Sequence, residues 1–140
     1  MQYITHSEQE TRALAAGLAD RLTDGSVVCL NGQMGAGKTA FTKGLMEKLG
    51  CADDVASPTF AICREYRGKL RVLHFDLYRI SDEDELFATG FFDSLDSGAC
   101  CVIEWSAVAD RFLPEDTIYI DFEYGAGEND RVISVRNGEI

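Results

Sequence analysis

Eight residues constrain this chain more than any other part of its sequence: Gly32-Gln33-Met34-Gly35-Ala36-Gly37-Lys38-Thr39. Glycines allow the backbone to curl so that successive N–H groups point inward, and a helix that starts behind them adds the positive end of its dipole. Before the loop, the apolar run from Ser26 to Asn31 is too short for a helix and predicts a buried strand. After it, apolar residues at helical spacing predict a helix from Lys38 to Gly50. A strand, a glycine loop and a helix in this order predict a phosphate loop, which binds the phosphates of a nucleoside triphosphate.

The side chains of the loop indicate how the triphosphate would be held. Lys38 would reach the β- and γ-phosphates as a mobile positive charge, and the Thr39 hydroxyl would ligate the Mg²⁺ that bridges them. The phosphates would also be surrounded by the backbone N–H groups of Met34, Gly35, Ala36 and Gly37. We therefore expect a nucleoside triphosphate and Mg²⁺ as the cofactors.

The second protein ligand of magnesium is normally a carboxylate oxygen of an Asp or Glu at the C-terminal end of a neighbouring buried strand. Two runs end in this way, Val72 to Asp76 and Cys101 to Glu104. Both acids cannot be the primary ligand, and their spacing does not say which one is. Together they suggest a divided task, in which one acid holds the metal and the other orients or deprotonates the attacking water.

The rest of the sequence predicts a single α/β domain over residues 1–140 with a mixed, partly antiparallel sheet. Ser7 and Glu10 have the pattern of a capping box that starts a helix ending at Asp24-Gly25. A short acidic helix is predicted after Ser81, which stands in the position of its N-cap. The other predicted strands form a hairpin of Thr59 to Tyr66 and Leu70 to Tyr78, a buried strand from Ala99 to Trp105, and a final hairpin of Thr117 to Tyr124 and Arg131 to Asn137.

Charge and cysteine content exclude several classes of protein. Thirteen Lys and Arg against 24 Asp and Glu give a net charge of −11, so direct binding of nucleic acid is not expected. The five cysteines are odd in number and include no Cys-x-x-Cys pair, so neither a disulfide framework nor a four-thiolate zinc site is predicted. No stretch approaches the roughly 18 to 20 apolar residues that span a bilayer. We expect a protein of the cytoplasm with no membrane contact.

Several other residues have both a structural and a functional interpretation. Ser57-Pro58-Thr59-Phe60 lies where nucleotide switches place a Thr that senses the γ-phosphate, but the sequence alone favours the start of an ordinary strand. A lone Trp105 is more often a packing residue than a chemical one, and His74 is assigned no catalytic role for the same reason. The acidic run Asp82 to Glu85 is expected to be a solvated helix start, with a docking surface for a basic partner as the alternative.

Taken in order, four motifs resemble the bacterial TsaE family, also called YjeE. They are the glycine loop, Ser57-Pro58-Thr59-Phe60, His74-Phe75-Asp76-Leu77-Tyr78-Arg79 and Glu104-Trp105. The resemblance covers nearly the whole chain and implies a P-loop NTPase-like three-layer fold. It also implies a slow ATPase that works with the proteins TsaB and TsaD, which install threonylcarbamoyl on the adenosine beside the anticodon of ANN-decoding tRNAs. The tRNA would then meet this chain only indirectly, through the complex.

The resemblance assigns roles that spacing leaves open. Lys38 and Thr39 become the phosphate-loop lysine and a magnesium ligand, Glu104 becomes the second metal-side acid, and Asp76 becomes the acid near the γ-phosphate and the attacking water. It also implies nucleotide contacts by Thr59, Trp105, Glu8, Thr11 and Arg131. Family members usually follow Glu-Trp with an acid or proline, whereas Ser106 follows here, which puts a role for that third position in doubt.

Two other functions fit a phosphate loop. A small-molecule kinase would transfer the γ-phosphate to an acceptor hydroxyl and would usually need an arginine-bearing lid, for which the sequence has no insertion of sufficient length. A nucleotide-dependent protein-binding module would bind ATP without depending on its turnover.

Overall fold

The computed structural model describes residues 1–33, 35–51 and 62–140. Its strands are β1 (Gln2–Thr5), β2 (Val27–Gly32), β3 (Cys63–Arg67), β4 (Arg71–Asp76), β5 (Cys100–Glu104), β6 (Ile118–Tyr124) and β7 (Arg131–Arg136). The helices are α1 (Glu8–Ala19), α2 (Lys38–Lys48), α3 (Glu83–Ala88) and α4 (Phe91–Leu95), with two short 3-10 turns, η1 (Ser106–Val108) and η2 (Asp110–Phe112).

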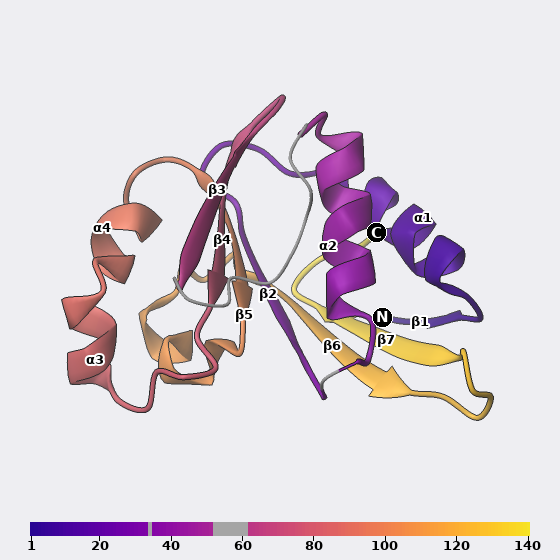
Figure 1. Ribbon diagram of the computed structural model, residues 1–140. Helices are drawn as coiled ribbons and strands as arrows, with labels where there is room; N and C mark the ends of the chain where they lie inside the picture. Colours follow the sequence, from indigo (N-terminus) through magenta and orange to yellow (C-terminus); the bar gives the residue numbers. More distant parts are fainter. Residues whose placement is uncertain (34, 52–61) are drawn as a thin grey trace.

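The strands form one seven-stranded sheet in the order β1-β7-β6-β2-β5-β4-β3 (Figure 1). The four central strands β6, β2, β5 and β4 are parallel, and antiparallel pairing adds β3 at one edge and β7 with β1 at the other. The predicted mixed, partly antiparallel sheet is therefore confirmed. Because parallel strands share one direction, the C-terminal ends of β2, β4 and β5 meet at the same edge of the sheet.

Helices cover the sheet on both faces, as a three-layer fold requires. Along β2, Val28 and Leu30 pack under α1 and α2, whereas Val27 and Cys29 point to the cluster that includes residues of α3 and α4. Figure 1 shows α1 and α2 on one side of the sheet and α3 with α4 on the other. Burial on both faces explains why β2 and β5 begin with short continuous apolar runs and do not alternate with polar residues.

The two helices on the first face are in close contact. A side chain at Gly44 of α2 would place its Cβ 2.3 Å from the carbonyl oxygen of Arg12 in α1, so only glycine allows this approach. At the start of α1 the Ser7 hydroxyl accepts a hydrogen bond from the Glu10 N–H at 3.1 Å, as the cap pattern predicts. The helix ends at Ala19, several residues before the predicted end at Asp24-Gly25.

Other element predictions need correction at their boundaries. Strand β1 and helix α4 were not anticipated, because each is only four or five residues long and shows no complete period. The N-cap of α3 is Asp82, whose carboxylate accepts from the Glu85 N–H, and not Ser81. In the first hairpin the described strand begins at Cys63, and the predicted part before residue 62 lies outside the described residues.

All five cysteines are present as thiols, and none of them forms a disulfide. Cys29, Cys100 and Cys101 are buried in the strands, where burial raises the pKa of the first two thiols to about 12 and that of Cys101 to about 11. They therefore act as small apolar residues. Among the described helices, none has the length and apolar character needed to cross a bilayer.

Candidate functional site

The glycine loop joins the end of β2 to the start of α2. Gly35 and Gly37 have φ angles of +78° and +109°, which favour glycine at these two points of the turn. Gly37 is the N-cap of α2 and supplies no side-chain hydrogen bond, so the first-turn N–H groups have no side-chain cap of the kind that Ser7 gives α1. A helix start of this kind suits an anion. Met34 lies outside the described residues.

Lys38 is held at the base of this loop. Its ammonium nitrogen Nζ donates to the Gly32 carbonyl oxygen at 2.7 Å and lies 3.8 Å from the centre of the Trp105 ring. Burial lowers the pKa of Lys38, and the charges of Glu104 and Asp76 oppose that shift. A buried ammonium next to an anion-binding helix start is well placed to move onto a phosphate.

Trp105 is held in an unusual backbone conformation. Its φ of +57° and ψ of +55° are left-handed, which is uncommon for a residue with a large side chain. The Tyr78 ring packs against it with centroids 4.9 Å apart. The next residue, Ser106, is held by the side-chain amide of Asn31. The Asn31 oxygen accepts from the Ser106 N–H and the Asn31 nitrogen donates to the Ser106 hydroxyl, each at 3.0 Å. The residue after Glu-Trp therefore fastens the end of β5 to β2.

The two candidate acids lie side by side. Strands β4 and β5 are parallel, and their register pairs Asp76 with Glu104 at the C-terminal edge of the sheet. Glu104 is buried, whereas Asp76 is partly exposed and accepts a hydrogen bond from the Tyr78 N–H at 3.0 Å. Burial, with a contribution from the Glu104 charge, raises the pKa of Asp76. The structure thus brings both acids next to Lys38.

His74 also belongs to this group of side chains, although no role was predicted for it from the sequence. Its Nε2 lies 2.8 Å from Oε2 of Glu104, and both side chains are at most 4% exposed. Within the described part of the chain its other ring nitrogen, Nδ1, has no partner. The signal that could have found it is the strand period of two, because His74 and Asp76 share one face of β4.

Of the nucleotide contacts that the resemblance implies, Thr11 and Arg131 lie beside the loop. A Cβ at Gly37 would lie 3.8 Å from Thr11 and 3.9 Å from Arg131. Arg131 also donates to the Gly35 carbonyl oxygen at 3.4 Å, and the Thr11 hydroxyl is fixed by a 2.7 Å hydrogen bond to Thr5 of β1. Glu8 is exposed at the first position of α1 and takes part in none of these contacts.

Tyr124 is a neighbour of the loop that sequence reasoning missed. Its hydroxyl would lie 2.8 Å from a Cβ at Gly35, and the Arg131 guanidinium lies 4.6 Å from the centre of its ring. It ends β6 before the final turn, where nothing in the local sequence distinguishes it from an ordinary strand residue. Thr59 and the rest of the predicted switch turn lie outside the described residues.

The oxygen donors at this edge suit a magnesium ion shared with a triphosphate. Thr39 is exposed at the second position of α2, and two carboxylates end the adjacent strands. Among the described residues there is no cluster of three or more His, Cys, Asp or Glu able to hold a metal by themselves. Mg²⁺ usually takes one or two carboxylates and completes its shell with phosphates and water, so this sparse set fits it.

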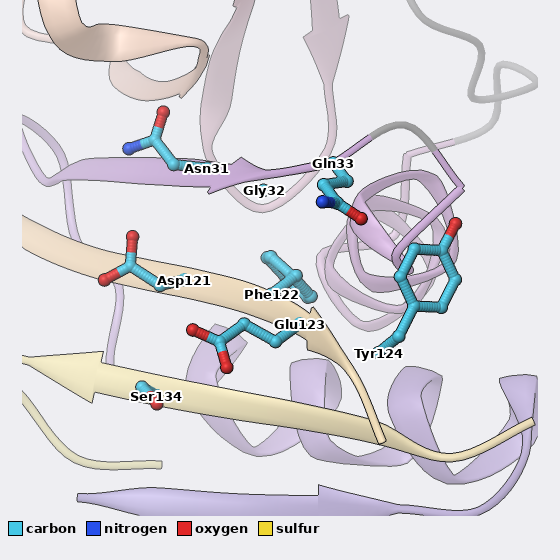
Figure 2. Close-up of a pocket in the computed structure, with 8 residues that line it drawn as sticks. All are labelled: Asn31, Gly32, Gln33, Asp121, Phe122, Glu123, Tyr124 and Ser134. Carbon is cyan, nitrogen blue, oxygen red and sulfur yellow. The ribbon is translucent and has the colours of Figure 1, made fainter. Parts of the chain in front are cut away.

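A separate pocket of about 680 Å³ opens beside the loop, over β6 and β7 (Figure 2). The carboxylates of Asp121 and Glu123 line it, and Gly32, Gln33, Phe122 and Tyr124 border it beside the loop. Two carboxylates would repel a triphosphate, so the phosphates belong on the helix side of the loop.

A mixed sheet with parallel central strands, a glycine loop between β2 and α2, and paired acids at the ends of β4 and β5 together define a nucleotide-binding protein of the P-loop class. A family model described as "Threonylcarbamoyl adenosine biosynthesis protein TsaE" matches residues 5–133. The chain therefore belongs to the TsaE family, and the resemblance found in the sequence is confirmed.

Individual relatives agree with the family match. The TsaE protein of Treponema pallidum is 36% identical over 129 residues, covering 92% of this chain and 96% of that protein. The TsaE protein of Bacillus subtilis is 37% identical over 135 residues, covering 96% and 84%. The crystal structure of Bacillus subtilis YdiB has a TM-score of 0.78 and 31% identity over 99% of this chain and 86% of that one.

Proposed function

We propose that this chain is a magnesium-dependent ATPase of the cytoplasm that supports the TsaB- and TsaD-dependent threonylcarbamoylation of adenosine 37 in ANN-decoding tRNAs. One observation carries the ATPase part of the proposal: the register of β4 and β5 pairs Asp76 with Glu104, and both charges act on Lys38. Membership of a family described by threonylcarbamoyl adenosine biosynthesis supports the pathway. A net charge of −11 favours contact with the tRNA through partner proteins.

In the proposed reaction the loop N–H groups and Lys38 bind and orient the phosphates. Asp76 accepts a proton from the water that attacks the γ-phosphorus, ADP leaves, and inorganic phosphate is formed. Glu104 and Thr39 would hold the magnesium ion, whose charge offsets that of the phosphates when it is bound. A Glu104 carboxylate fixed by His74 suits a metal-side role, whereas Asp76 is partly exposed and can reach water.

The nucleotide contacts proposed for the rest of the site involve the loop residues, Trp105, Thr11 and Arg131, with Glu8 and Thr59 as further candidates. Packing of the Lys38 ammonium on Trp105 supports an aromatic position beside the nucleotide. The sequence has no evident arginine finger to neutralise the transition state, so we propose a slow rate for the isolated chain. Arginines supplied by a partner accelerate related reactions by roughly 10³ to 10⁵.

The experiment is phosphate release from ATP by the chain alone and then with TsaB, TsaD and substrate tRNA. We expect slow turnover alone, faster turnover in the complex, and equal amounts of ADP and inorganic phosphate. No phosphate release under either condition would overturn the proposal. A phosphorylated metabolite would indicate a kinase instead, and full tRNA modification by a Glu104→Gln variant that binds ATP but does not hydrolyse it would indicate a binding module.

A further inference from the structure

The negative charge of this protein is concentrated in one segment. Residues 81–116 contain ten Asp or Glu and one basic residue, Arg111, so they carry −9 of the total charge of −11. All of this segment is described, and it forms α3, α4, β5 and the turns η1 and η2. Helices α3 and α4 lie on the face of the sheet opposite α1 and α2 (Figure 1). The rest of the chain is nearly neutral.

An exposed aromatic cluster lies within this acidic segment. Phe87 of α3 is 58% exposed and stacks on Phe92 of α4 with ring centroids 4.4 Å apart. Phe112 of η2 packs edge-on against Phe92 at 5.0 Å. Behind them Phe91 contacts both Phe92 and the core residue Phe75. Packing on Phe91 therefore fixes the position of the cluster, while the Phe87 ring remains exposed to water. Exposure of an apolar ring costs free energy, which a bound partner would recover by covering it.

Acidic side chains surround these rings. Glu83 is four residues before Phe87 and Asp84 three before it, so both share its side of α3. Asp96, the C-cap of α4, is four residues after Phe92 and lies on its side of that helix. The nearby basic residue, Arg111, is paired with Glu83 through a 2.6 Å hydrogen bond. We call Phe87, Phe92 and Phe112 with Asp84 and Asp96 the acidic aromatic face.

We propose that the acidic aromatic face docks a folded protein that presents lysine and arginine side chains around an apolar pocket for Phe87. A rigid aromatic anchor inside a charged rim is the usual arrangement of an interface with a small energetic centre. Charge decides the kind of partner. RNA and an anionic membrane are repelled, and a second copy of this chain would bring an equal charge of −9 against the first.

The position of the face also links it to the candidate site. The chain that leaves Asp76 at the end of β4 packs Tyr78 on Trp105 and then enters α3. The chain that leaves Glu104 at the end of β5 passes through η1 to Phe112 in η2, and Ser106 on this path bonds Asp110 at 2.6 Å. A protein bound here would contact both segments that follow the candidate acids. This inference rests on the proposed function, because it treats the docked protein as the partner that stimulates turnover.

The test measures binding of the full-length protein to purified TsaB and TsaD. Two variants alter the face without touching the nucleotide site: Phe87→Ser, and the double variant Asp84→Asn with Asp96→Asn. The matched control, Asp20→Asn with Glu139→Gln, removes the same charge from exposed positions outside the acidic segment. ATP affinity of each variant, measured separately, reports whether the fold and the site are retained.

We expect Phe87→Ser to weaken binding by about ten-fold or more and the acid double variant to slow association several-fold with a weaker dependence on salt. The control should bind like the unaltered protein. Unchanged binding by both face variants would overturn this inference while leaving the proposed function intact. If the unaltered protein did not bind TsaB and TsaD at all, the proposed function would fail and the docking inference with it.

Discussion

His74 and Glu104 form a buried hydrogen-bonded pair on adjacent strands, with Nε2 2.8 Å from Oε2. In the tautomer that carries its proton on Nε2, the imidazole donates to the Glu104 carboxylate and fixes the direction of that side chain. Histidine and carboxylate positions behind a metal site commonly orient the ligands that touch it. We therefore expect His74 to position the proposed metal-side acid.

Replacing His74 tests this relationship. In His74→Leu the Glu104 carboxylate loses its donor, and we expect kcat for ATP hydrolysis to fall by roughly ten-fold to a hundred-fold, with a much smaller change in ATP affinity. His74→Gln restores an N–H donor and should recover part of the rate. Steady-state kinetics of the partner-stimulated reaction would measure both. Equal rates for His74→Leu and the unaltered protein would rule out a positioning role.

The fluorescence of Trp105, the only tryptophan in the sequence, should report movement of Lys38 when nucleotide binds. Because the Lys38 ammonium packs on the Trp105 ring in the structure, its movement onto a phosphate would change the surroundings of the ring. We expect a saturable change in tryptophan fluorescence on addition of ATP and Mg²⁺. Lys38→Ala should weaken ATP binding by about ten-fold or more, since charge-assisted hydrogen bonds contribute about 1.5–3 kcal/mol. A calorimetric affinity for Lys38→Ala equal to that of the unaltered protein would contradict the proposed role.

Asp76→Asn should separate activity from stability. Burial raises the pKa of Asp76 above its unfolded value, so its ionised form costs stability above the folded pKa and costs none below the unfolded pKa. The variant should therefore lose ATP hydrolysis, while its free energy of unfolding at pH 8 should increase by about 1 kcal/mol or less. Urea titrations should show this gain shrinking as the pH falls toward 4. A gain that grew on acidification would have the wrong sign for this explanation.

Gly44 tests the packing that positions α2. Gly44→Ala places a methyl group 2.3 Å from the Arg12 carbonyl oxygen, so α1 and α2 must separate, and we expect a loss of about 1–3 kcal/mol in unfolding free energy. The matched control is Gly17→Ala in α1, where the new Cβ meets only the end of the Ile140 side chain at 3.2 Å. That change should be neutral or slightly stabilising because alanine favours a helix. Equal effects of the two substitutions in urea unfolding would contradict the proposed close approach.

Local patterns in the sequence predicted most of the central sheet. Strand β2, the glycine loop and α2 lie within two residues of their predicted bounds, because a short apolar run, glycines and a helical period each specify local structure. Strand β1 was missed since four residues carry too little pattern, yet it supplies Thr5 to fix Thr11. Tyr124 likewise reaches the loop only through the pairing of β6 with β2.

The sequence by itself determined that a loop for phosphates connects a buried strand to a helix, and that two acids end apolar runs. It did not indicate which acid would hold the metal and which would act on the attacking water, because spacing along the chain does not determine which strands become neighbours. Only the tertiary structure placed β4 beside β5, which brings Asp76 next to Glu104 and puts His74 within hydrogen-bond distance of it. Parallel pairing of strands far apart in sequence depends on packing over the whole sheet, so no local pattern encodes it.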